Sequence, residues 1–386
     1  MEKARRYQAI YFVYFAAFSG FVAYRNVFYQ ELGMDGVQMG ILGSLLVASG
    51  VLAQPVWGVV ADYTRSPSRV ITFAAALSGV AILTYPLAMG LPGNPFVLVA
   101  VGTIAYAATR APIVPISNAL VVSRGYNYAL TRSFGSLAFG ATVLTLSAVL
   151  AWTGVSIIVY VYVAGMVVLV ALLRGVPEVE KTVFKGSLGG QALGLVRQPR
   201  YLLVLLAAFA MGFVSFGGSA FFSVYMRAVG LGDGLTGVAW ATKTAAEVVV
   251  FLSLSRLDRW HGLAVAAAGL TYAGGFAALS AFPSIGPVLL ANVGMGLGVA
   301  FVYFALVNLA HDCAPDGLDS TAQTLVTSVG IGAGGTIGEV VIGWTVDAVG
   351  VQFMYRYLAL ASLSLTLCGG LLVVMRVRNR SSRLGM

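Results

Sequence analysis

Five charged side chains stand inside long apolar segments of the 386-residue sequence. They are Arg25, Arg110, Lys243, Glu247 and Glu339. An ionised side chain near the centre of a bilayer costs at least about 2.5–3.5 kcal/mol, so each of these residues is a candidate for ligand binding or proton transfer. Carboxylates can take up protons and guanidinium groups bind anions, so these residue types predict a site that handles charge.

Lys243 and Glu247 are four positions apart in the segment AWATKTAAEVVVF. They can pair along their own helix, although lysine before glutamate is the weaker order for such a contact, and partners on other helices are the other possibility. Counting about 1.5 Å per residue places Arg110 and Glu247 at similar depths in the membrane. We therefore predict that Arg110 can face Glu247, and that Glu339 can meet Lys243 or Arg25. The alternative is a fixed structural ion pair.

Glu247 is the principal candidate for a proton switch. Apolar surroundings favour a protonated carboxyl and a nearby cation favours its ionised form, so a cation that moves can drive proton uptake and release. We predict proton coupling by Glu247, Glu339 and Lys243. The alternative for Glu339, which follows the glycine-rich GIGAGGTIG, is to cap a tight helix contact between segments 320–346 and 235–254.

Arg110 lies in YAATRAPIVPISNAL, where Pro112 and Pro115 are expected to break the helical hydrogen bonds. Its guanidinium group can bind a carboxylate with two parallel hydrogen bonds, and the alternative is that it binds the freed carbonyls. Arg25 lies about 27 Å along its helix, so it can either bind solute or extend to the outer headgroups. Arg132 opens a helix and is expected to anchor it at the membrane surface.

The composition indicates a membrane protein with many crossings. The sequence is 59% hydrophobic and 10% charged, with a mean hydropathy of +0.89. A crossing needs roughly 20 apolar residues, and runs of that length recur along the chain. The predicted spans are roughly 7–31, 36–60, 70–90, 95–121, 132–152, 154–174, 201–226, 235–254, 262–281, 286–310, 320–346 and 354–375.

Lysine and arginine predict the orientation, because cytoplasmic loops retain them. They fall on one side of the predicted spans: Lys3, Arg5, Arg6, Arg65, Arg69, Arg124, Arg174, Lys181, Lys185, Arg197, Arg200, Arg256, Arg259, Arg376, Arg378, Arg380 and Arg383. Both termini are therefore expected in the cytoplasm, and the chain in the cytoplasmic membrane. This topology accounts for the net charge of +9, so nucleic-acid binding is not expected.

The sequence contains an internal repeat. The stretch ELGMDGVQMG at residues 31–40 resembles AVGLGDGLTG at residues 228–237, and each precedes an expected helix. We predict an all-α protein of about twelve transmembrane helices in two six-helix bundles, residues 1–175 and 201–386, joined by a cytoplasmic linker at 176–200. Such a duplication favours a site near the bilayer midplane between the bundles.

The loop after the second span carries a family pattern. Gly58, Asp62, Arg65 and Arg69 resemble the G-x-x-x-D motif, followed by basic residues, of the major facilitator superfamily. The resemblance implies a gating loop at these residues, and Arg65 departs from the pattern because the family often has glycine there. The stretches LTRSFGSLAFG, AEVVVFLSLSRLDRWHG and STAQTLVTSVGIGAGGTIGEVVIGWTVDAVG resemble the branch that contains lactose permease, nucleoside-proton symporters and phenylpropionate permeases. For Arg132 in the first stretch, the resemblance implies a cavity arginine as the alternative to a surface anchor.

Two departures from that branch bear on the substrate. The charged helix 10 cluster of lactose permease has no counterpart in NVGMGLGVAFVYFALVN, and PIVPISNALVV has no acidic residue where the sugar-binding glutamate is expected. Galactoside transport by that mechanism is therefore not expected.

The resemblance implies that helices 1, 4 and 10 line the solute path, and we predict solute binding by Arg110, Arg25, Asn118, Tyr14, Tyr24, Asn292, Tyr303 and Asn308. The alternative for each uncharged residue is a bond to a neighbouring helix.

These features predict a secondary active transporter that moves a small organic solute by alternating access and proton symport. An organic or aromatic acid is the first choice of substrate, since three buried cations face two buried carboxylates, and a sugar or nucleoside is the second. The alternatives are proton-coupled efflux, or a sensor or scramblase of the same fold. The chain is not expected to be an enzyme or to bind a metal or cofactor. A monomer in the lipid bilayer is expected, with the proton as coupling ion.

Overall fold

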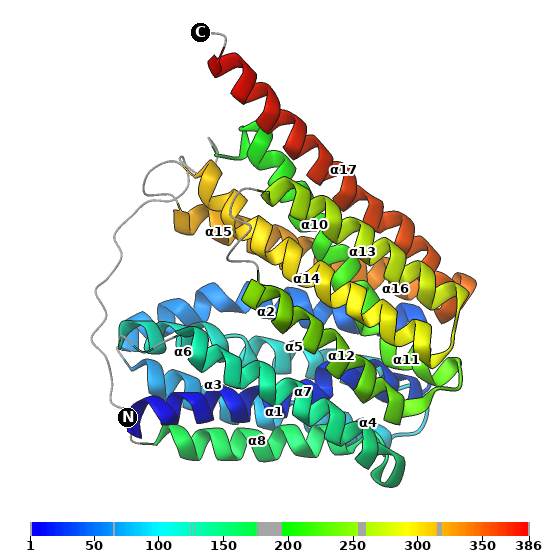
Figure 1. The fold of residues 1–386 in the computed structure, drawn as a ribbon. Coiled ribbons are helices and arrows are strands. Elements are labelled where there is room, and N and C mark those ends of the chain that lie inside the picture. Colours follow the sequence, from blue (N-terminus) through cyan, green and yellow to red (C-terminus); the bar gives the residue numbers. More distant parts are fainter. Residues whose placement is uncertain are drawn as a thin grey trace. The chain divides into compact units, whose positions relative to one another are not determined.

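The computed structural model describes residues 2–64, 66–124, 126, 128–174, 176, 195–253, 260–314 and 319–384, which are almost entirely helical (Figure 1). The helices are α1 (Glu2–Glu31), α2 (Gly36–Thr64), α3 (Pro67–Ala81), α4 (Thr84–Met89), α5 (Phe96–Arg110), α6 (Ile113–Ser123), α7 (Tyr128–Thr153), α8 (Ile157–Leu173), α10 (Pro199–Ala220), α11 (Phe222–Ala228), α12 (Gly232–Ser253), α13 (His261–Ala281), α14 (Ile285–Cys313), α15 (Asp319–Thr327), the π-helix η2 (Ser328–Gly335), α16 (Thr336–Val349) and α17 (Val351–Leu384).

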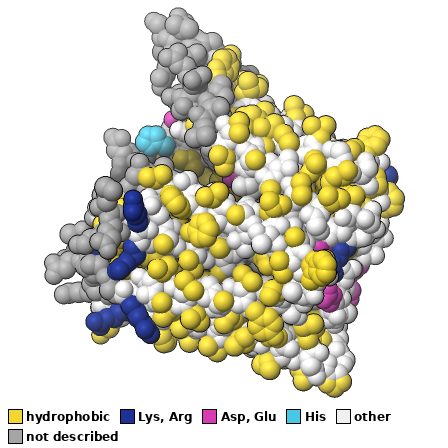
Figure 2. All heavy atoms as spheres, turned by 60° about the horizontal axis from the view of Figure 1, so that its bottom comes forward, with side chains coloured by type: hydrophobic (Ala, Val, Ile, Leu, Met, Phe, Trp, Pro, Cys, Tyr) yellow, Lys and Arg dark blue, Asp and Glu magenta, His cyan; other side chains and the backbone are white. Residues whose placement is uncertain are grey.

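Nine stretches of the described residues are long and apolar enough to cross a membrane, and each coincides with a predicted span. The other predicted spans also form helices. Of these, α8 is apolar but shorter, whereas α1 and α12 contain Arg25, Lys243 and Glu247 among their apolar residues. Figure 2 shows hydrophobic side chains spread over the face in view, with Lys and Arg gathered toward its edges. An all-helical membrane protein is thus confirmed, and the count of twelve spans stays a prediction.

The described residues form two compact units. Unit 1 contains those up to residue 184 together with Ala220–Ala241, and unit 2 contains those of 185–219 and from Thr242 onward. Helices α11 and the start of α12 thus belong to unit 1, while the remainder of α12 belongs to unit 2. The predicted bundle boundaries at residues 175 and 200 stay predictions.

Aromatic side chains form the interior of unit 1. Helix α1 packs against α7 and α8, and α5 packs against α2 and α3. The Phe21 ring meets Tyr85 and Tyr106 edge to face, with centroids 5.4 and 4.9 Å apart. The Tyr85 hydroxyl lies 3.0 Å from the Tyr29 hydroxyl and 2.8 Å from Thr103 Oγ1. These bonds satisfy buried hydroxyl groups, so large rings can fill the space between the helices.

The repeated stretches fold in the same way where α1 and α11 end. Gly33 and Gly230 have φ angles of 77° and 78°, a conformation that glycine adopts without strain. The following residue bonds back to the helix at each end: Met34 N donates to Tyr29 O and Leu231 N to Met226 O, at 3.1 and 2.9 Å. This is the Schellman pattern of helix ends. The internal repeat therefore corresponds to two equivalent helix ends.

The segment Ala220–Ala241 is held to α1 and α7 within unit 1. Arg227 donates to Glu31 at 2.9 Å and to Asp233 at 2.7 Å, and Ser223 Oγ donates to the Ala23 carbonyl. A Cβ atom at Gly237 would lie 2.1 Å from Ser147 Oγ, so α12 begins in close contact with α7. These contacts cluster at the end of α1 opposite the N-terminus.

Glycines give the helices of unit 2 close contacts. Helix α13 packs against α14 and α17, and these three run side by side (Figure 1). Cβ atoms at Gly334 and Gly338 would lie 2.3 and 2.6 Å from carbonyl oxygens of α10. The close packing predicted for GIGAGGTIG is confirmed. The nearest neighbours of these glycines are on α10, and the contact with segment 235–254 that was the alternative for Glu339 stays a prediction.

Candidate functional site

Arg110 is the last residue of α5, and α6 begins at Ile113. The break between them confirms the effect predicted for Pro112, whose ring nitrogen cannot donate a helical hydrogen bond. Trp57 Nε1 of α2 donates to the Ala108 carbonyl at 2.8 Å and holds this end of α5. Arg110 is therefore placed at an interruption in the middle of a long apolar segment.

The Arg110 guanidinium group is oriented by tyrosine and phenylalanine side chains of unit 1. Its Nη1 donates to the Tyr14 hydroxyl at 2.9 Å. Its Cζ lies 4.2 Å from the centre of the Phe18 ring and 5.6 Å from that of Tyr106. A cation over an aromatic face gains about 0.5–2 kcal/mol, depending on how far it is removed from water. Arg110 and Tyr14, both predicted from the sequence, are thus brought together.

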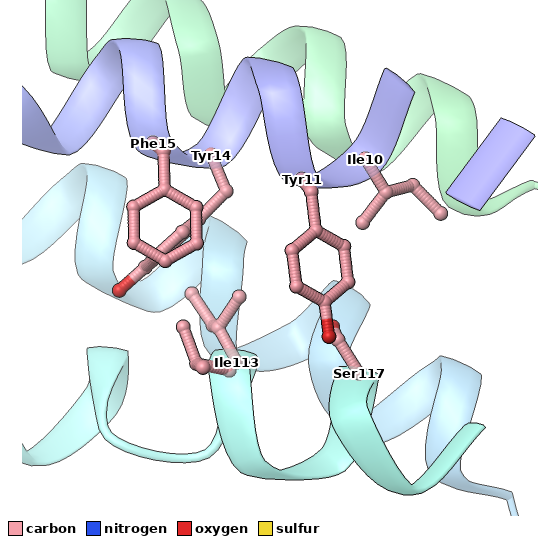
Figure 3. A pocket seen from close by; sticks show the side chains of 7 residues that line it. Ile10, Tyr11, Tyr14, Phe15, Ile113 and Ser117 are labelled. Carbon is pink, nitrogen blue, oxygen red and sulfur yellow. The ribbon is translucent and has the colours of Figure 1, made fainter. Parts of the chain in front are cut away.

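Tyr11 and Asn118 form a second polar pair, between α1 and α6. The Tyr11 hydroxyl donates to Asn118 Oδ1. Figure 3 shows Tyr11, Tyr14 and Phe15 pointing from α1 toward α6, around a cavity of about 10 Å³ that Ile113 and Ser117 also line. A cavity of this size holds roughly one water molecule. The cavity is therefore too small to hold a solute.

Arg132 lies next to the same cluster, whereas the sequence favoured an anchor at the membrane surface and the family resemblance implied a cavity arginine as the alternative. Its Cζ lies 4.4 Å from the centre of the Phe15 ring, and its Nη1 donates to Ser136 Oγ at 3.3 Å. Phe15 packs edge to face on Tyr14, with centroids 5.2 Å apart. A Cβ atom at Gly135 would lie 2.6 Å from the Phe15 ring, so this glycine gives the ring its room. The signal in the sequence was LTRSFGSLAFG, with glycine three residues after the arginine.

Tyr24 and Arg25 were also predicted to bind solute. They lie nearer to the C-terminal end of α1, where Arg227 binds Glu31. Tyr24 is fully buried, and its hydroxyl donates to the Asp233 carbonyl at 3.4 Å. Arg25 is only 6% exposed, so its side chain is enclosed within the protein. The structure therefore groups Tyr24 with the contact between α1 and α12. A role in solute binding stays a prediction for both residues.

The predicted gating loop is described in part. Gly58 lies in α2, and the space around a Cβ atom there is open. Asp62 follows one turn later in the same helix, and Arg69 is exposed in the first turn of α3. Arg65 lies outside the described residues. The gating role of Gly58, Asp62, Arg65 and Arg69 stays a prediction.

Lys243 and Glu247 belong to a polar cluster in unit 2. Lys243 Nζ donates to Ser219 Oγ of α10 at 3.2 Å and interacts electrostatically with Glu247 along α12. Glu247 also interacts electrostatically with the hydroxyl groups of Tyr272 and Tyr303. The sequence predicted Tyr303 as a solute ligand, and the structure associates it with the carboxylate.

Tyr272 and two serines of α10 were missed by sequence reasoning. The Tyr272 hydroxyl and Ser215 Oγ are hydrogen-bonded at 2.6 Å, and Ser219 lies one turn after Ser215. Small hydroxyl residues in an apolar helix are common, so the type of residue gives little signal. The spacing of the serines, four apart in GFVSFGGSA, places both on one face of α10 and could have suggested this face.

Gly296 brings α14 against this part of α12. A Cβ atom at Gly296 would lie 2.3 Å from the Lys243 carbonyl oxygen. Two asparagines of α14 that were predicted to bind solute donate instead to their own helix: Asn292 Nδ2 to Val288 O at 2.9 Å, and Asn308 Nδ2 to Phe304 O at 2.8 Å. One donor of each amide is thus engaged by the backbone, and solute binding by them stays a prediction.

Glu339 is fully buried in the first turn of α16, immediately after the π-helix. A π-helical turn is rare and is frequent at functional sites. The pairings predicted for Glu339 with Lys243 or Arg25, and for Arg110 with Glu247, stay predictions. Within the described residues, no group of His, Cys, Asp and Glu has the arrangement of a metal site.

Comparison with known proteins decides the family. The model of the family described as "MFS_1 like family" matches residues 4–357. The chain belongs to this family. Maltose permease of Geobacillus stearothermophilus is 27% identical over 385 residues, 97% of this chain and 94% of that protein. The uncharacterized transporter YwbF of Bacillus subtilis (strain 168) is 23% identical over 357 residues, 88% of this chain and 86% of that protein.

Solved structures agree with membership of the MFS_1-like family. The nucleoside transporter NupG has a TM-score of 0.81 at 16% identity and covers 97% of this chain and 99% of its own. A bacterial homologue of the iron transporter ferroportin, in its inward-facing state, has a TM-score of 0.74 at 15% identity, covering 97% and 98%. At such identities they show the fold alone. The resemblance to the major facilitator superfamily is confirmed, and the chain is a transporter of a small solute and not an enzyme.

Proposed function

We propose that this transporter carries a neutral, hydroxyl-rich solute, a sugar or a nucleoside, by alternating access. The observation that carries the proposal is the wall of unit 1, where the pairs Arg110–Tyr14 and Tyr11–Asn118 lie among aromatic rings. Guanidinium, hydroxyl and amide groups together donate and accept hydrogen bonds, as sugar hydroxyls require. Aromatic rings beside a few polar groups are typical of small-molecule sites.

The relatives support this class of solute over an organic acid. The maltose permease matches this chain over nearly its whole length, and the nucleoside transporter NupG shares its fold. The sequence placed an organic acid first. The presence of Arg132 beside Phe15, near Tyr14 and Arg110, keeps an organic acid as the second candidate, because two guanidinium groups favour an anion.

We further propose that transport is proton symport and that Glu247 takes up the proton, with Lys243 and Glu339 as its partners in the coupling. Glu247 interacts with a lysine and with two tyrosine hydroxyl groups. A carboxyl whose surroundings include a cation can change its protonation when that cation is drawn away. Proton-coupled efflux is the alternative, and it would use the same group in the opposite direction.

The finer topology belongs to the same proposal. Twelve spans with both termini in the cytoplasm agree with the described helices and with the loops where lysine and arginine gather. We also propose that the protein is a monomer in the cytoplasmic membrane. The helices α1, α8 and α12 supply the spans beyond the apolar stretches of the described residues.

Ligand-dependent stability followed by uptake tests the proposal. Purified protein is heated with maltose and related sugars, nucleosides or aromatic acids, and the ligands that raise Tm are then offered to liposomes under an imposed pH gradient. A sugar or nucleoside should raise Tm and accumulate when the outside is acidic. Stabilisation by aromatic acids alone would favour the second candidate. Solute expulsion under the same gradient would indicate efflux.

A further inference from the structure

Unit 2 contains a cavity of about 300 Å³ where α10 and α13 begin and α14 and α17 end. Arg200 of α10 and Arg376 of α17 line it, together with the start of α13 from Trp260 to Leu263. Its volume is at the lower end of the range of small-molecule sites. The proposed solute site does not use these residues, so the cavity needs its own explanation.

The charged lining of this cavity is basic. Arg200 Nη2 contacts Asp312 Oδ2 at 3.2 Å, and His261 Nδ1 lies 3.7 Å from the same oxygen. Asp312 does not itself line the cavity. A guanidinium group carries five N–H donors, so one contact with Asp312 does not saturate Arg200. With Arg376 as the second guanidinium, the lining favours an anionic group, and arginine is well matched to the oxygens of a phosphate.

The other lining residues are apolar, and several are exposed. Trp260, Leu263 and Val377 are 59%, 53% and 62% exposed, while Leu309 and Leu372 are buried on the inner side. Tryptophan beside arginine is typical of the level of lipid headgroups, where one side of the residue is apolar and the other is wet. An occupant with a phosphate and an adjoining apolar part would use both kinds of lining.

We propose that this cavity binds the phosphate of an anionic phospholipid headgroup. The two arginines contact the phosphate, and the exposed apolar side chains contact the start of the acyl chains. A free phosphate offers the same anionic group without the apolar part, so the two sources can be separated by experiment. The site concerns the lipid around the transporter and does not depend on the identity of the transported solute.

Native mass spectrometry of the full-length protein can count bound lipids. The protein is titrated with phosphatidylglycerol or with the zwitterionic phosphatidylcholine, in each case with and without inorganic phosphate. We expect phosphatidylglycerol to bind about tenfold more tightly than phosphatidylcholine, because the positively charged choline group of the latter offsets the charge of the phosphate and is repelled by the two guanidinium groups. The double variant R200Q/R376Q should lose this preference. The single variant R376Q, on an exposed position of α17, should reduce it while keeping the fold.

A matched double variant controls for the loss of two positive charges. Arg69 and Arg197 are exposed and do not line the cavity, so R69Q/R197Q should keep the preference for phosphatidylglycerol. If inorganic phosphate displaces the lipid and binds with the same dependence on Arg200 and Arg376, the lipid source is overturned in favour of free phosphate. Equal binding of both lipids, or equal losses in the cavity and control variants, would overturn the site itself.

Discussion

The two units hold their candidate residues by different means. In unit 1, side chains hold one another: Arg110 is bonded to Tyr14 and lies over Phe18. In unit 2, backbones come close: Gly296 lets α14 lie against α12 at Lys243, where a Cβ atom would be 2.3 Å from the carbonyl oxygen. Substitution of Arg110 should therefore act on the first cluster, and substitution of Gly296 on the second.

The two clusters also differ in what their groups can do. Arginine stays protonated in proteins, and tyrosine and asparagine stay uncharged near neutral pH. The hydrogen-bonding groups of the cluster in unit 1 therefore do not change their protonation. The cluster of unit 2 contains Glu247, which can exist with or without its proton, beside Lys243. The difference suggests a division of labour, in which unit 1 binds the solute and unit 2 handles the proton.

Substitution of Arg110 by glutamine should give the largest loss of solute binding. A hydrogen bond to a charged group contributes about 1.5–3 kcal/mol, so affinity should fall roughly ten- to a hundredfold. Equilibrium binding to the purified variant measures it. Arg356 is a matched control, because it also contacts a hydroxyl group, Ser280 at 3.1 Å, and lies over a ring, Phe353 at 4.6 Å. Equal losses in R110Q and R356Q would argue against a solute site at Arg110.

Substitution of Gly296 by alanine should act on the proton cluster and not on solute binding. The added Cβ atom forces α14 from α12, and overpacking of this kind costs about 1–3 kcal/mol. Tm should fall, and proton-driven uptake should fall more than solute affinity does. Gly274→Ala is the control, since the space around that position of α13 is open. A variant with normal Tm and normal uptake would show that the contact at Lys243 does not matter.

Substitution of Tyr11 by phenylalanine should have the smallest effect. It removes the hydroxyl that donates to Asn118 and leaves the ring in place. The loss of one neutral hydrogen bond is about 0.5–1.5 kcal/mol, so solute affinity should fall several-fold. Tyr29→Phe removes a comparable bond, to Tyr85, from the aromatic interior of unit 1. That control should lower Tm without changing affinity, and a reversed pattern would remove Tyr11 from the solute wall.

Local signals in the sequence predicted much of the fold. Proline after Arg110 predicted the break between α5 and α6, and the repeated stretches, which were predicted to precede corresponding helices, form equivalent helix ends at Gly33 and Gly230. Glycine spacing predicted close packing at Gly334 and Gly338. Each of these features depends on backbone geometry within a few residues, which composition and spacing express directly.

The candidate site was less predictable because its contacts join distant parts of the chain. Arg132 joins the cluster only because α7 packs on α1 and places it over Phe15. Tyr272 was missed for the same reason, since its partner Ser215 is on another helix. Asn292 and Asn308 show the converse, because residue type alone does not say that an amide donates to its own helix.

Glu247→Gln tests the division of labour most directly. The glutamine keeps a polar side chain of the same size but cannot take up a proton. Solute exchange should therefore persist in the variant, whereas proton-driven uptake should be lost. Liposomes loaded with solute measure exchange, and liposomes under an imposed pH gradient measure accumulation. The Glu247→Gln variant should still exchange solute, and its rate of transport should no longer depend on pH. It should accumulate no more solute with a pH gradient than without one, while the control Asp347→Asn accumulates solute normally. Normal proton-driven accumulation by Glu247→Gln, with normal pH dependence, would contradict the proposed role of unit 2.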